Sequence, residues 1–306
     1  MADQAQALRD IMDRYTGRSS SPKTRVVTIT SGKGGVGKSN FSLNFALALE
    51  KRGLKVVLLD ADFGLANIDV LMGSSAPYHL HHLITREKTV WEVMNRGANG
   101  LEYIAGGSGV YDLLRMNEEE ISYFVSQIQQ LNGYADYLLI DTGAGLSKET
   151  ARLISSSDET IVVTTPEPTA IADAYALMKM VYVTERYRNF RLVVNRVTDD
   201  REGVQTADKL DRVASSFLGF SIPFLGSLPD DPEVGRAVKK QVPFTIDSPR
   251  SPASRSLFQL AGRYAAAPAG ASGTAPAEAA GGLKSFLSRF ISKAFFGAQS
   301  RRSDRD

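Results

Sequence analysis

The sequence predicts a three-layer α/β fold, in which a mostly parallel sheet carries helices on both faces. Six apolar runs, each of strand length, are separated by stretches long enough for a helix. The runs are apolar at consecutive positions, which indicates strands buried on both faces. A chain of 306 residues, 43% of them apolar, can also bury a large core. The predicted strands are residues 26–30, 56–60, 137–141, 160–164, 192–197 and 224–228.

Sequence character changes three times along the chain. A short helix is predicted near the start, because Leu8, Ile11, Met12 and Tyr15 recur at helical spacing before a Ser- and Pro-containing linker. The alternating strands and helices follow, and an Ala-, Gly- and Pro-rich tether then leads to a second amphipathic stretch with a basic tail. The four predicted segments are residues 1–24, 25–264, 265–282 and 283–306.

The composition excludes several kinds of site and location. The chain has no cysteine, which excludes a disulfide framework, a thiolate-held iron–sulfur cluster and a cysteine nucleophile. The residues before the first apolar run are polar, unlike a signal peptide, and no apolar window reaches the roughly 20 residues of a spanning helix. We therefore expect a cytoplasmic protein.

The near-neutral net charge of +2 hides an asymmetry. Residues 283–306 carry six basic residues against two acidic ones, so the rest of the chain has 30 basic and 32 acidic residues. A mildly acidic body with a basic tail favours an acidic partner for the tail, and no specific nucleic acid is expected for the body.

The first predicted strand runs into a glycine-rich loop that precedes a predicted helix. Gly32, Gly37, Lys38 and Ser39 have the spacing Gly-x-x-x-x-Gly-Lys-Ser. Glycines let backbone N–H groups converge on phosphate oxygens at a helix N-terminus, where the helix dipole favours anions. The lysine supplies charge to the outer phosphates and the serine hydroxyl can ligate Mg²⁺. The predicted nucleotide-binding residues here are Gly32, Lys33, Gly34, Gly35, Val36, Gly37, Lys38, Ser39 and Asn40, within a P-loop NTPase fold.

Carboxylates follow two of the predicted strands. Asp60 and Asp62 leave the second strand at alternate positions, pointing the same way toward the phosphates, although Asp60 can equally be a structural anchor of the loop. Asp141 ends the third apolar run, which is the position of a Walker-B carboxylate that holds Mg²⁺ through a water.

The loop also contains an early lysine, Lys33, in the pattern Lys-Gly-Gly-x-Gly-Lys-Ser. This pattern resembles the deviant P-loop of the MinD/ParA ATPases, and the resemblance covers about residues 25–260. It implies a slow ATPase that works as an ATP-bound homodimer with Mg²⁺, in which Lys33 reaches the partner's nucleotide. It also implies that Asp62 orients the attacking water near Mg²⁺, with Lys33, Lys38 and Asp62 as the catalytic residues.

The base-binding positions are assigned by the same resemblance. Asn195 and Arg196 end the fifth predicted strand, and Pro229 and Asp230 follow the sixth. In this family the asparagine reads the adenine edge and the Pro–Asp turn packs on the ring. The strand ends lack a guanine-type Asn/Thr-Lys-x-Asp signature, so ATP is expected rather than GTP.

Three segments are similar to the flagellar branch of this family, the FlhG/FleN type: residues 58–73, 164–177 and 3–9. The resemblance implies control of flagellar number and placement together with an FlhF-type GTPase. It further implies contact with flagellar switch-complex proteins or a flagellar transcription factor. The element resembling Asp-Gln-Ala-x-x-Leu-Arg activates the GTPase in that branch, although its pattern also fits a helix docked at the domain edge. Its residues are Asp3, Gln4, Ala5, Leu8 and Arg9.

The final segment predicts a conditional membrane anchor. Its apolar residues recur at helical spacing on one face, and Lys284 and Lys293 flank that face, where they can reach lipid phosphates. Such a helix suits the surface of an anionic membrane, and we expect reversible association with the inner face of the cell membrane. The same face also fits docking on the domain itself, and both states can alternate with ADP and ATP. The residues predicted to contact lipid, besides the two lysines, are Leu283, Phe286, Leu287, Phe290, Ile291 and Phe295.

Two alternative functions remain open from the sequence. One is a division-site MinD, which the N-terminal extension disfavours. The other is a ParA-like ATPase that positions DNA cargo, which would bind DNA without sequence preference and with a steep salt dependence. The acidic body and the apolar tail disfavour the second alternative.

Overall fold

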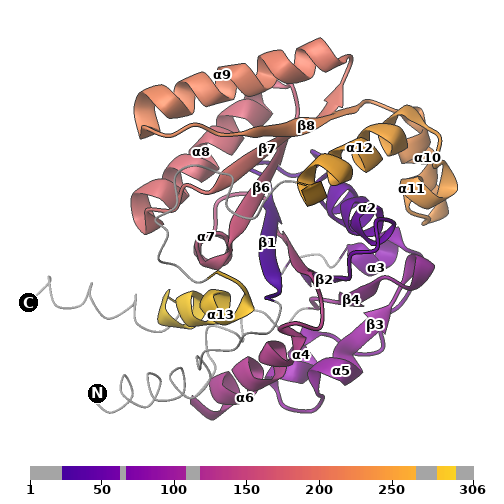
Figure 1. Cartoon of the computed structure of the whole chain (residues 1–306), viewed down its shortest axis with the longest axis vertical. Coiled ribbons are helices and arrows are strands. Elements are labelled where there is room, and N and C mark those ends of the chain that lie inside the picture. Colours follow the sequence, from indigo (N-terminus) through magenta and orange to yellow (C-terminus); the bar gives the residue numbers. More distant parts are fainter. Residues whose placement is uncertain (1–22, 63–66, 108–117, 267–280, 294–306) are drawn as a thin grey trace, which may run out of the picture.

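One eight-stranded sheet forms the middle layer of the protein (Figure 1). The computed structural model describes residues 23–62, 67–107, 118–266 and 281–293. The strand order is β3-β4-β2-β5-β1-β6-β7-β8, and every neighbouring pair is parallel except β3 and β4. The strands are β1 (Arg25–Thr30), β2 (Val56–Ala61), β3 (Met94–Arg96), β4 (Glu102–Ile104), β5 (Tyr137–Thr142), β6 (Glu159–Thr164), β7 (Phe190–Val197) and β8 (Phe224–Pro229).

This sheet confirms the predicted fold class and all six predicted strands, whose ends shift by no more than two residues. The two strands that the sequence did not indicate are β3 and β4. Each has three residues, too few to show either strand alternation or an apolar run. They extend the sheet beyond β2 and do not touch the polar ends of β1 and β5.

Helices cover both faces of the sheet, as predicted. The longer helices are α2 (Lys38–Glu50), α6 (Glu118–Ile128), α7 (Lys148–Ser156), α8 (Pro168–Glu185), α9 (Asp200–Leu218), α10 (Pro232–Lys240), α12 (Pro252–Ala266) and α13 (Leu283–Ile291). The shorter ones are α3 (Ile68–Leu71), α4 (Leu80–Ile84), α5 (Val90–Val93) and α11 (Phe244–Asp247), with 3₁₀ turns η1 (Ala98–Gly100) and η3 (Gln129–Leu131). No helix in the described ranges is both long and apolar enough to cross a membrane.

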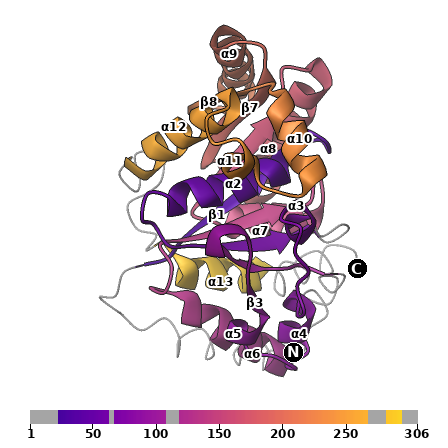
Figure 2. The same cartoon turned by 90° about the vertical axis from the view of Figure 1, so that its right-hand side faces the viewer.

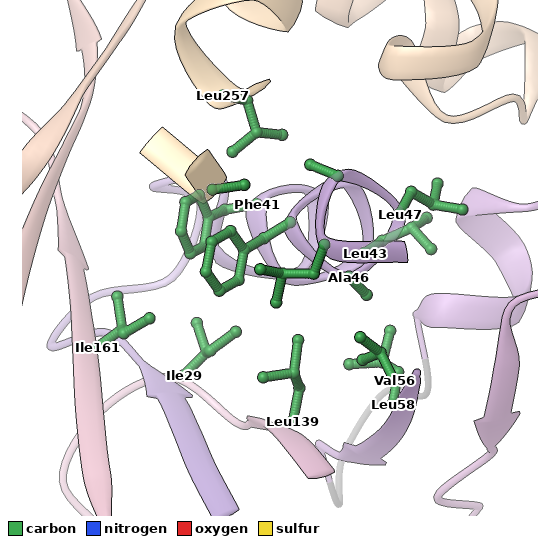
Figure 3. Close-up of a cluster of buried hydrophobic side chains, with 14 of the residues drawn as sticks. Ile29, Phe41, Leu43, Ala46, Leu47, Val56, Leu58, Leu139, Ile161 and Leu257 are labelled. Carbon is green, nitrogen blue, oxygen red and sulfur yellow. The ribbon is translucent and has the colours of Figure 1, made fainter. Parts of the chain in front are cut away.

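Consecutive residues of β1 explain why the strand runs are apolar throughout. Val26 and Val27 are both fully buried, but they belong to apolar clusters on opposite faces of the sheet. On one face, Ile29 and Leu139 of the sheet point toward Phe41 of α2 (Figure 3). Figure 2 shows α2, α11 and α12 on this side of the sheet, and α5, α6 and α13 on the other.

The predicted membrane helix begins where predicted, but in this structure it is docked on the domain. Five of its apolar side chains are 0–6% exposed and belong to the cluster that also contains Val26, Leu131 and Leu153. The docked alternative left open by the sequence is therefore the one that the structure shows. These side chains are Leu283, Phe286, Leu287, Phe290 and Ile291; Phe295 lies outside the described residues.

The segment boundaries near α12 and α13 differ slightly from the predicted ones. Helix α12 continues to Ala266, two residues into the predicted tether, while residues 267–280 lie outside the described ranges. The predicted N-terminal helix, with Asp3, Gln4, Ala5, Leu8 and Arg9, also lies outside them, and the description starts at Lys23.

A buried charge cluster holds the amino-terminal edge of the sheet. Glu159, the first residue of β6, is fully buried, accepts a 3.0 Å bond from Arg25 of β1 and pairs with Arg191 of β7. The hydroxyl of Tyr264, from α12, donates to Glu159 at 2.7 Å. This carboxylate thus joins three elements of the sheet and one covering helix.

We expect Glu159→Ala to lower the free energy of unfolding by about 3 kcal/mol or more, because it leaves two mostly buried guanidinium groups without their carboxylate. Chemical denaturation measures the change. Glu119→Gln, which removes one partner of an exposed ion pair, is the matched control and should cost under about 0.5 kcal/mol. An equal loss in both variants would contradict this account of the cluster.

Candidate functional site

The glycine-rich loop joins β1 to α2 at the carboxyl edge of the sheet. Gly37 immediately precedes α2 and has a φ of +89°, a left-handed conformation that favours glycine. At Gly32, a Cβ would lie 2.2 Å from the carbonyl carbon of Asp173 in α8, so no larger residue fits there. Gly37 is thus required by its backbone conformation at the N-terminus of α2, and Gly32 by the close approach of α8.

Lys38, Ser39 and Asp141 come together below this loop. The Nζ of Lys38 lies 3.0 Å from Oδ2 of Asp141 and 3.0 Å from Oγ of Ser39. Lys38 is 6% exposed and Asp141 is fully buried, so each charge compensates the other in a desolvated place. Ser42, which sequence reasoning missed, donates to Oδ1 of Asp141 at 2.5 Å. Ser42 lies one helical turn after Lys38, and this spacing could have indicated that both side chains face Asp141.

Asp60 acts as the anchor of the loop that follows β2. Its carboxylate accepts N–H bonds from Asp62 at 3.0 Å, Asn67 at 3.0 Å and Ile68 at 3.2 Å, on both sides of residues 63–66. Burial, followed by the nearby carboxylate of Asp141, raises the pKa of Asp60 to about 7, although the three amide bonds lower it. The structural alternative raised for Asp60 is therefore what the contacts show.

Asp62 lies beside the loop that follows Asp141. A Cβ placed on Gly143 would be 3.4 Å from Oδ1 of Asp62, an ordinary contact distance, so this carboxylate lies directly against the loop. The same loop is tied to the phosphate loop, because the N–H of Gly145 donates to the carbonyl of Ser31 at 2.9 Å. The predicted positions of Asp62 and Asp141 thus meet at one edge of the sheet, next to the phosphate loop.

Lys33 is held by its own chain. Its Nζ pairs with Oε2 of Glu167 at 3.1 Å and donates to Oγ1 of Thr169 at 3.1 Å. The side chains of Lys33 and Glu167 are 40% and 59% exposed, so water and salt weaken this pair. Sequence reasoning did not single out Glu167 and Thr169, although both lie in the segment 164–177 that it compared with the flagellar branch.

Asn195, Arg196, Pro229 and Asp230 line one cavity of about 470 Å³. It opens beside Gly37 and Asn40 of the phosphate loop, and part of its lining is apolar. The structure therefore brings the four predicted base-binding residues together, next to the predicted phosphate site. The apolar residues, which sequence reasoning did not assign, are Phe41, Val234, Val238 and Phe244.

Asn195 has a second contact that the sequence did not indicate. Its Nδ2 donates to the carbonyl of Val36 in the phosphate loop at 2.8 Å. One amide N–H is therefore committed to the loop, while Oδ1 has no hydrogen-bond partner among the described residues and can accept from an adenine amino group. Asn195 thus links the base cavity to the phosphate loop.

These residues fit a nucleoside triphosphate with Mg²⁺. The loop offers backbone N–H groups at a helix N-terminus, Lys38 offers a cation, and the adjacent cavity is large enough for a base. Ser39, Asp62 and Asp141 supply the hard oxygen ligands that Mg²⁺ prefers.

Comparison with known proteins agrees with this arrangement. The family model described as ParA, NUBPL iron-transfer P-loop NTPase, matches residues 23–265. The chain belongs to the ParA/MinD family of P-loop ATPases. It has no cysteine to hold an iron–sulfur cluster, but as a member of this family it uses ATP and Mg²⁺ and hydrolyses ATP.

Curated relatives include flagellar and division proteins. The antiactivator FleN of Pseudomonas aeruginosa is 33% identical over 267 residues, which cover 87% of this chain and 93% of FleN. The flagellum site-determining protein YlxH of Helicobacter pylori is 33% identical over 304 residues, or 95% and 99% of the two chains. The septum site-determining protein MinD of Bacillus subtilis is 33% identical over 241 residues, or 78% and 87%.

Solved structures of the family share the fold. MinD in the MinC:MinD complex of Aquifex aeolicus has a TM-score of 0.64 and 25% identity, covering 79% of this chain and 96% of that chain. MinD of Pyrococcus horikoshii with Mg-ADP has a TM-score of 0.65 and 22% identity, covering 82% and 100%.

We expect Asn195→Ala to weaken ATP binding about fivefold to tenfold, because it removes the bond to Val36 and the free Oδ1 at the cavity. Titration calorimetry measures the dissociation constant. The control is Asn99→Gly, at an exposed left-handed position that does not line the cavity. Unchanged affinity in Asn195→Ala would remove Asn195 from the site.

We expect Asp60→Asn to gain stability relative to the unmodified chain as pH rises from 5 to 8 without nucleotide and Mg²⁺. The folded pKa of Asp60 lies above its unfolded value, so its contribution to stability is present at low pH and is lost as pH rises through about 7. Asparagine does not titrate. Urea denaturation of both proteins at each pH measures the difference, and a pH-independent difference would contradict the assignment.

Proposed function

We propose that this protein is an ATP-driven switch that controls flagellar number and placement with a GTPase of the FlhF type. The observation that carries the proposal is that helix α7 directly follows the loop of Asp141 at one end and contacts the docked α13 at the other. This helix begins just after the loop of Asp141, with Ser147 as its N-cap, and its last turn contacts α13. The similarity to FleN and YlxH over nearly the whole chain supports the flagellar assignment.

The contact between α7 and α13 is polar as well as apolar. Arg289 of α13 donates to the carbonyl of Ser156 at 2.9 and 2.6 Å, and Lys293 donates to the carbonyl of Ser155 at 3.3 Å. These are among the carbonyls that the end of a helix leaves unsatisfied, where cations are favoured. A shift of α7 that follows the loop of Asp141 would therefore disturb both bonds.

The chemical step is ATP hydrolysis. Lys38 would leave Asp141 for the outer phosphates, which the loop from Gly32 to Ser39 cradles through its N–H groups. Asp62 would orient the attacking water. When bound, Mg²⁺ neutralises charge on the phosphate oxygens, held by Ser39, by Asp62 and, through water, by Asp141.

Dimerisation would complete the site and make turnover slow. Lys33 is exposed at the rim of the loop, held by Glu167 and Thr169, and it would exchange these partners for the nucleotide of a second copy. Because that exchange needs two chains and ATP, hydrolysis would depend on dimer formation, and slow hydrolysis would give the dimer a long lifetime. This would suit a switch better than a metabolic enzyme.

Release of α13 would place the protein on the inner face of the cell membrane. Five apolar side chains, worth about 1.5–3 kcal/mol each when fully buried, are already buried in the docked state. Membrane burial therefore offers little net gain to one tail, and a modest change at α7 can decide the balance. Two tails in one dimer gain further through effective concentration.

The proposed partners follow from the two ends of the chain. The residues resembling the GTPase-activating element are Asp3, Gln4, Ala5, Leu8 and Arg9, and the tail would meet anionic lipid. Flagellar switch-complex proteins, or a flagellar transcription factor, would be further partners; the name antiactivator given to FleN supports the latter. The protein would otherwise be cytoplasmic.

Co-sedimentation with phosphatidylglycerol-containing vesicles tests the switch. We expect binding with ATP and little with ADP, and we expect Phe286→Asp with Phe290→Asp to abolish it. Ser288→Asn, on the more open side of α13, is the control for a substitution outside the apolar face and should retain most of the binding. Equal binding with ATP and ADP would contradict the switch, and no binding in any state would favour the ParA-like alternative.

We expect Asp62→Ala to bind ATP and remain dimeric, because the attacking water is no longer oriented and hydrolysis is slowed by about 100-fold. Light scattering after chromatography measures the mass with ATP. Asp69→Ala, in the adjacent α3, is the control and should cycle back to monomer. A variant Asp62→Ala that stays monomeric with ATP would refute the role of Asp62.

We expect Glu167→Gln to raise the fraction of ATP-dependent dimer at low protein concentration, because Lys33 loses its competing carboxylate. The gain should be about twofold to fivefold in dimer affinity, as for an exposed ion pair, and smaller at high salt. The same mass measurement in a dilution series checks it. Weaker dimerisation in Glu167→Gln would show that Glu167 supports the dimer instead.

A further inference from the structure

The groove that holds α13 contacts both apolar and basic side chains of this helix. It lies between α7, β1 and η3, and takes Leu283, Phe286, Leu287 and Phe290 into the core cluster. In Figure 1, α13 lies beside α7, near the lower end of β1. A segment that fills this groove therefore needs apolar residues at spacings of three and four.

The groove is also acidic at both ends. Asp158 accepts the N–H of Gly282 at 2.9 Å and faces the guanidinium of Arg289 at 3.3 Å. At the far end, Glu185 of α8 pairs with Lys293 at 3.0 Å. A helix that binds here thus also needs basic residues at the positions of Arg289 and Lys293.

The first twenty residues of the chain repeat this pattern. When residues 7–18 are aligned with residues 282–293, seven of the twelve positions carry the same class of side chain, four apolar and three basic. Both of the groove's ion-pairing positions keep a basic residue. The matched pairs are Leu8 with Leu283, Arg9 with Lys284, Ile11 with Phe286, Met12 with Leu287, Arg14 with Arg289, Tyr15 with Phe290, and Arg18 with Lys293.

The N-terminal segment also enters the domain at this groove. The carbonyl of Thr24 accepts the N–H of Leu283 at 3.0 Å, and the side chain of Lys23 borders Gly282. Bound in the place and direction of α13, residue 18 would take the position of Lys293, about 16.5 Å along the helix from Gly282, beside which Lys23 lies. The five residue steps from 18 to 23 reach about 18 Å at most, so the chain spans this distance only when this linker is fully extended.

We propose that residues 7–18 are a second occupant of the α13 groove, so that the two ends of the chain exchange there. The resting preference for α13 follows from the side chains. Phe286 and Phe290 stack in the groove at 5.9 Å, whereas Ile11 and Tyr15 offer no such stack, and Thr16 stands where Ile291 is buried. The N-terminal segment therefore takes the groove only when α13 has left it.

Residues 7–18 and α13 differ in charge, which gives them different affinities for an anionic membrane. Asp10 and Asp13 occupy the positions of Ser285 and Ser288, so residues 7–18 carry two carboxylates where α13 carries hydroxyls. Residues 7–18 therefore have a net charge of +1 and residues 282–293 a net charge of +3, so an anionic membrane attracts α13 more strongly. Membrane binding by α13 would then withdraw Leu8 and Arg9 from a partner. That consequence rests on the proposed function, whereas the exchange itself does not.

Amide hydrogen exchange of the full chain, without lipid or nucleotide, tests directly whether residues 7–18 can replace α13 in the groove. In the unmodified protein, amides of 283–291 should exchange slowly and those of 7–18 quickly. In the double variant Phe286→Asp with Phe290→Asp, this order should reverse, and the amides of 7–18 should exchange about tenfold or more slowly than in the unmodified protein. Adding Ile11→Asp and Tyr15→Asp should abolish that protection, and Ser288→Asp should leave the original pattern. Equal exchange of 7–18 in the unmodified and Phe-substituted chains would overturn the proposal.

A peptide of residues 5–19 gives a second measurement that needs no substitution in the protein. In excess over the intact chain, it should speed exchange of 283–291, whereas the same peptide with Ile11→Asp and Tyr15→Asp should not. No effect of the first peptide at millimolar concentration would overturn the proposal even if the substituted chain fails to fold. These two measurements use neither lipid nor ATP, so a negative result in them would not contradict the membrane switch. A negative result in the vesicle experiment would likewise not contradict the replacement of α13 by residues 7–18.

Discussion

The complete burial of β1 is the constraint on which the rest of the structure depends. This strand pairs with β5 on one side and β6 on the other, and both of its faces are covered by apolar clusters. A strand buried in this way can present polar groups only at its two ends. Its carboxyl end carries the phosphate loop, and its amino end meets the groove of α13.

The carboxyl and amino ends of the central strands place different charged groups. At the carboxyl edge, Lys38 and Asp141 keep opposite charges together in a desolvated place, and in the proposed function a phosphate would separate them. At the amino edge, Asp158 and Glu159 are consecutive residues whose side chains serve opposite faces of the sheet. Asp158 contacts α13, and Glu159 contacts Tyr264 of α12. The tether between α12 and α13 therefore joins helices that are anchored on opposite faces of one strand.

Much of the fold and the site followed from local patterns. The six long strands were predictable because each is a run of apolar residues, whereas β3 and β4 are too short to leave such a signal. Lys38, Ser39, Asp62 and Asp141 were predictable because each sits at a fixed offset from a strand end. Contacts between distant segments were not: the bond from Asn195 to Val36 joins residues 159 positions apart, and Lys33 meets Glu167 across 134.

The sequence by itself determined the fold class, the phosphate loop and the amphipathic nature of both chain ends, because each depends on residues close together in the chain. Only the tertiary structure decided where the apolar face of α13 lies. A helical stripe of Leu and Phe is equally satisfied by lipid and by a protein groove, since the hydrophobic effect is non-directional. What selects the groove is Asp158, Glu185 and the end of α7, which the fold brings to α13 from more than 100 residues away.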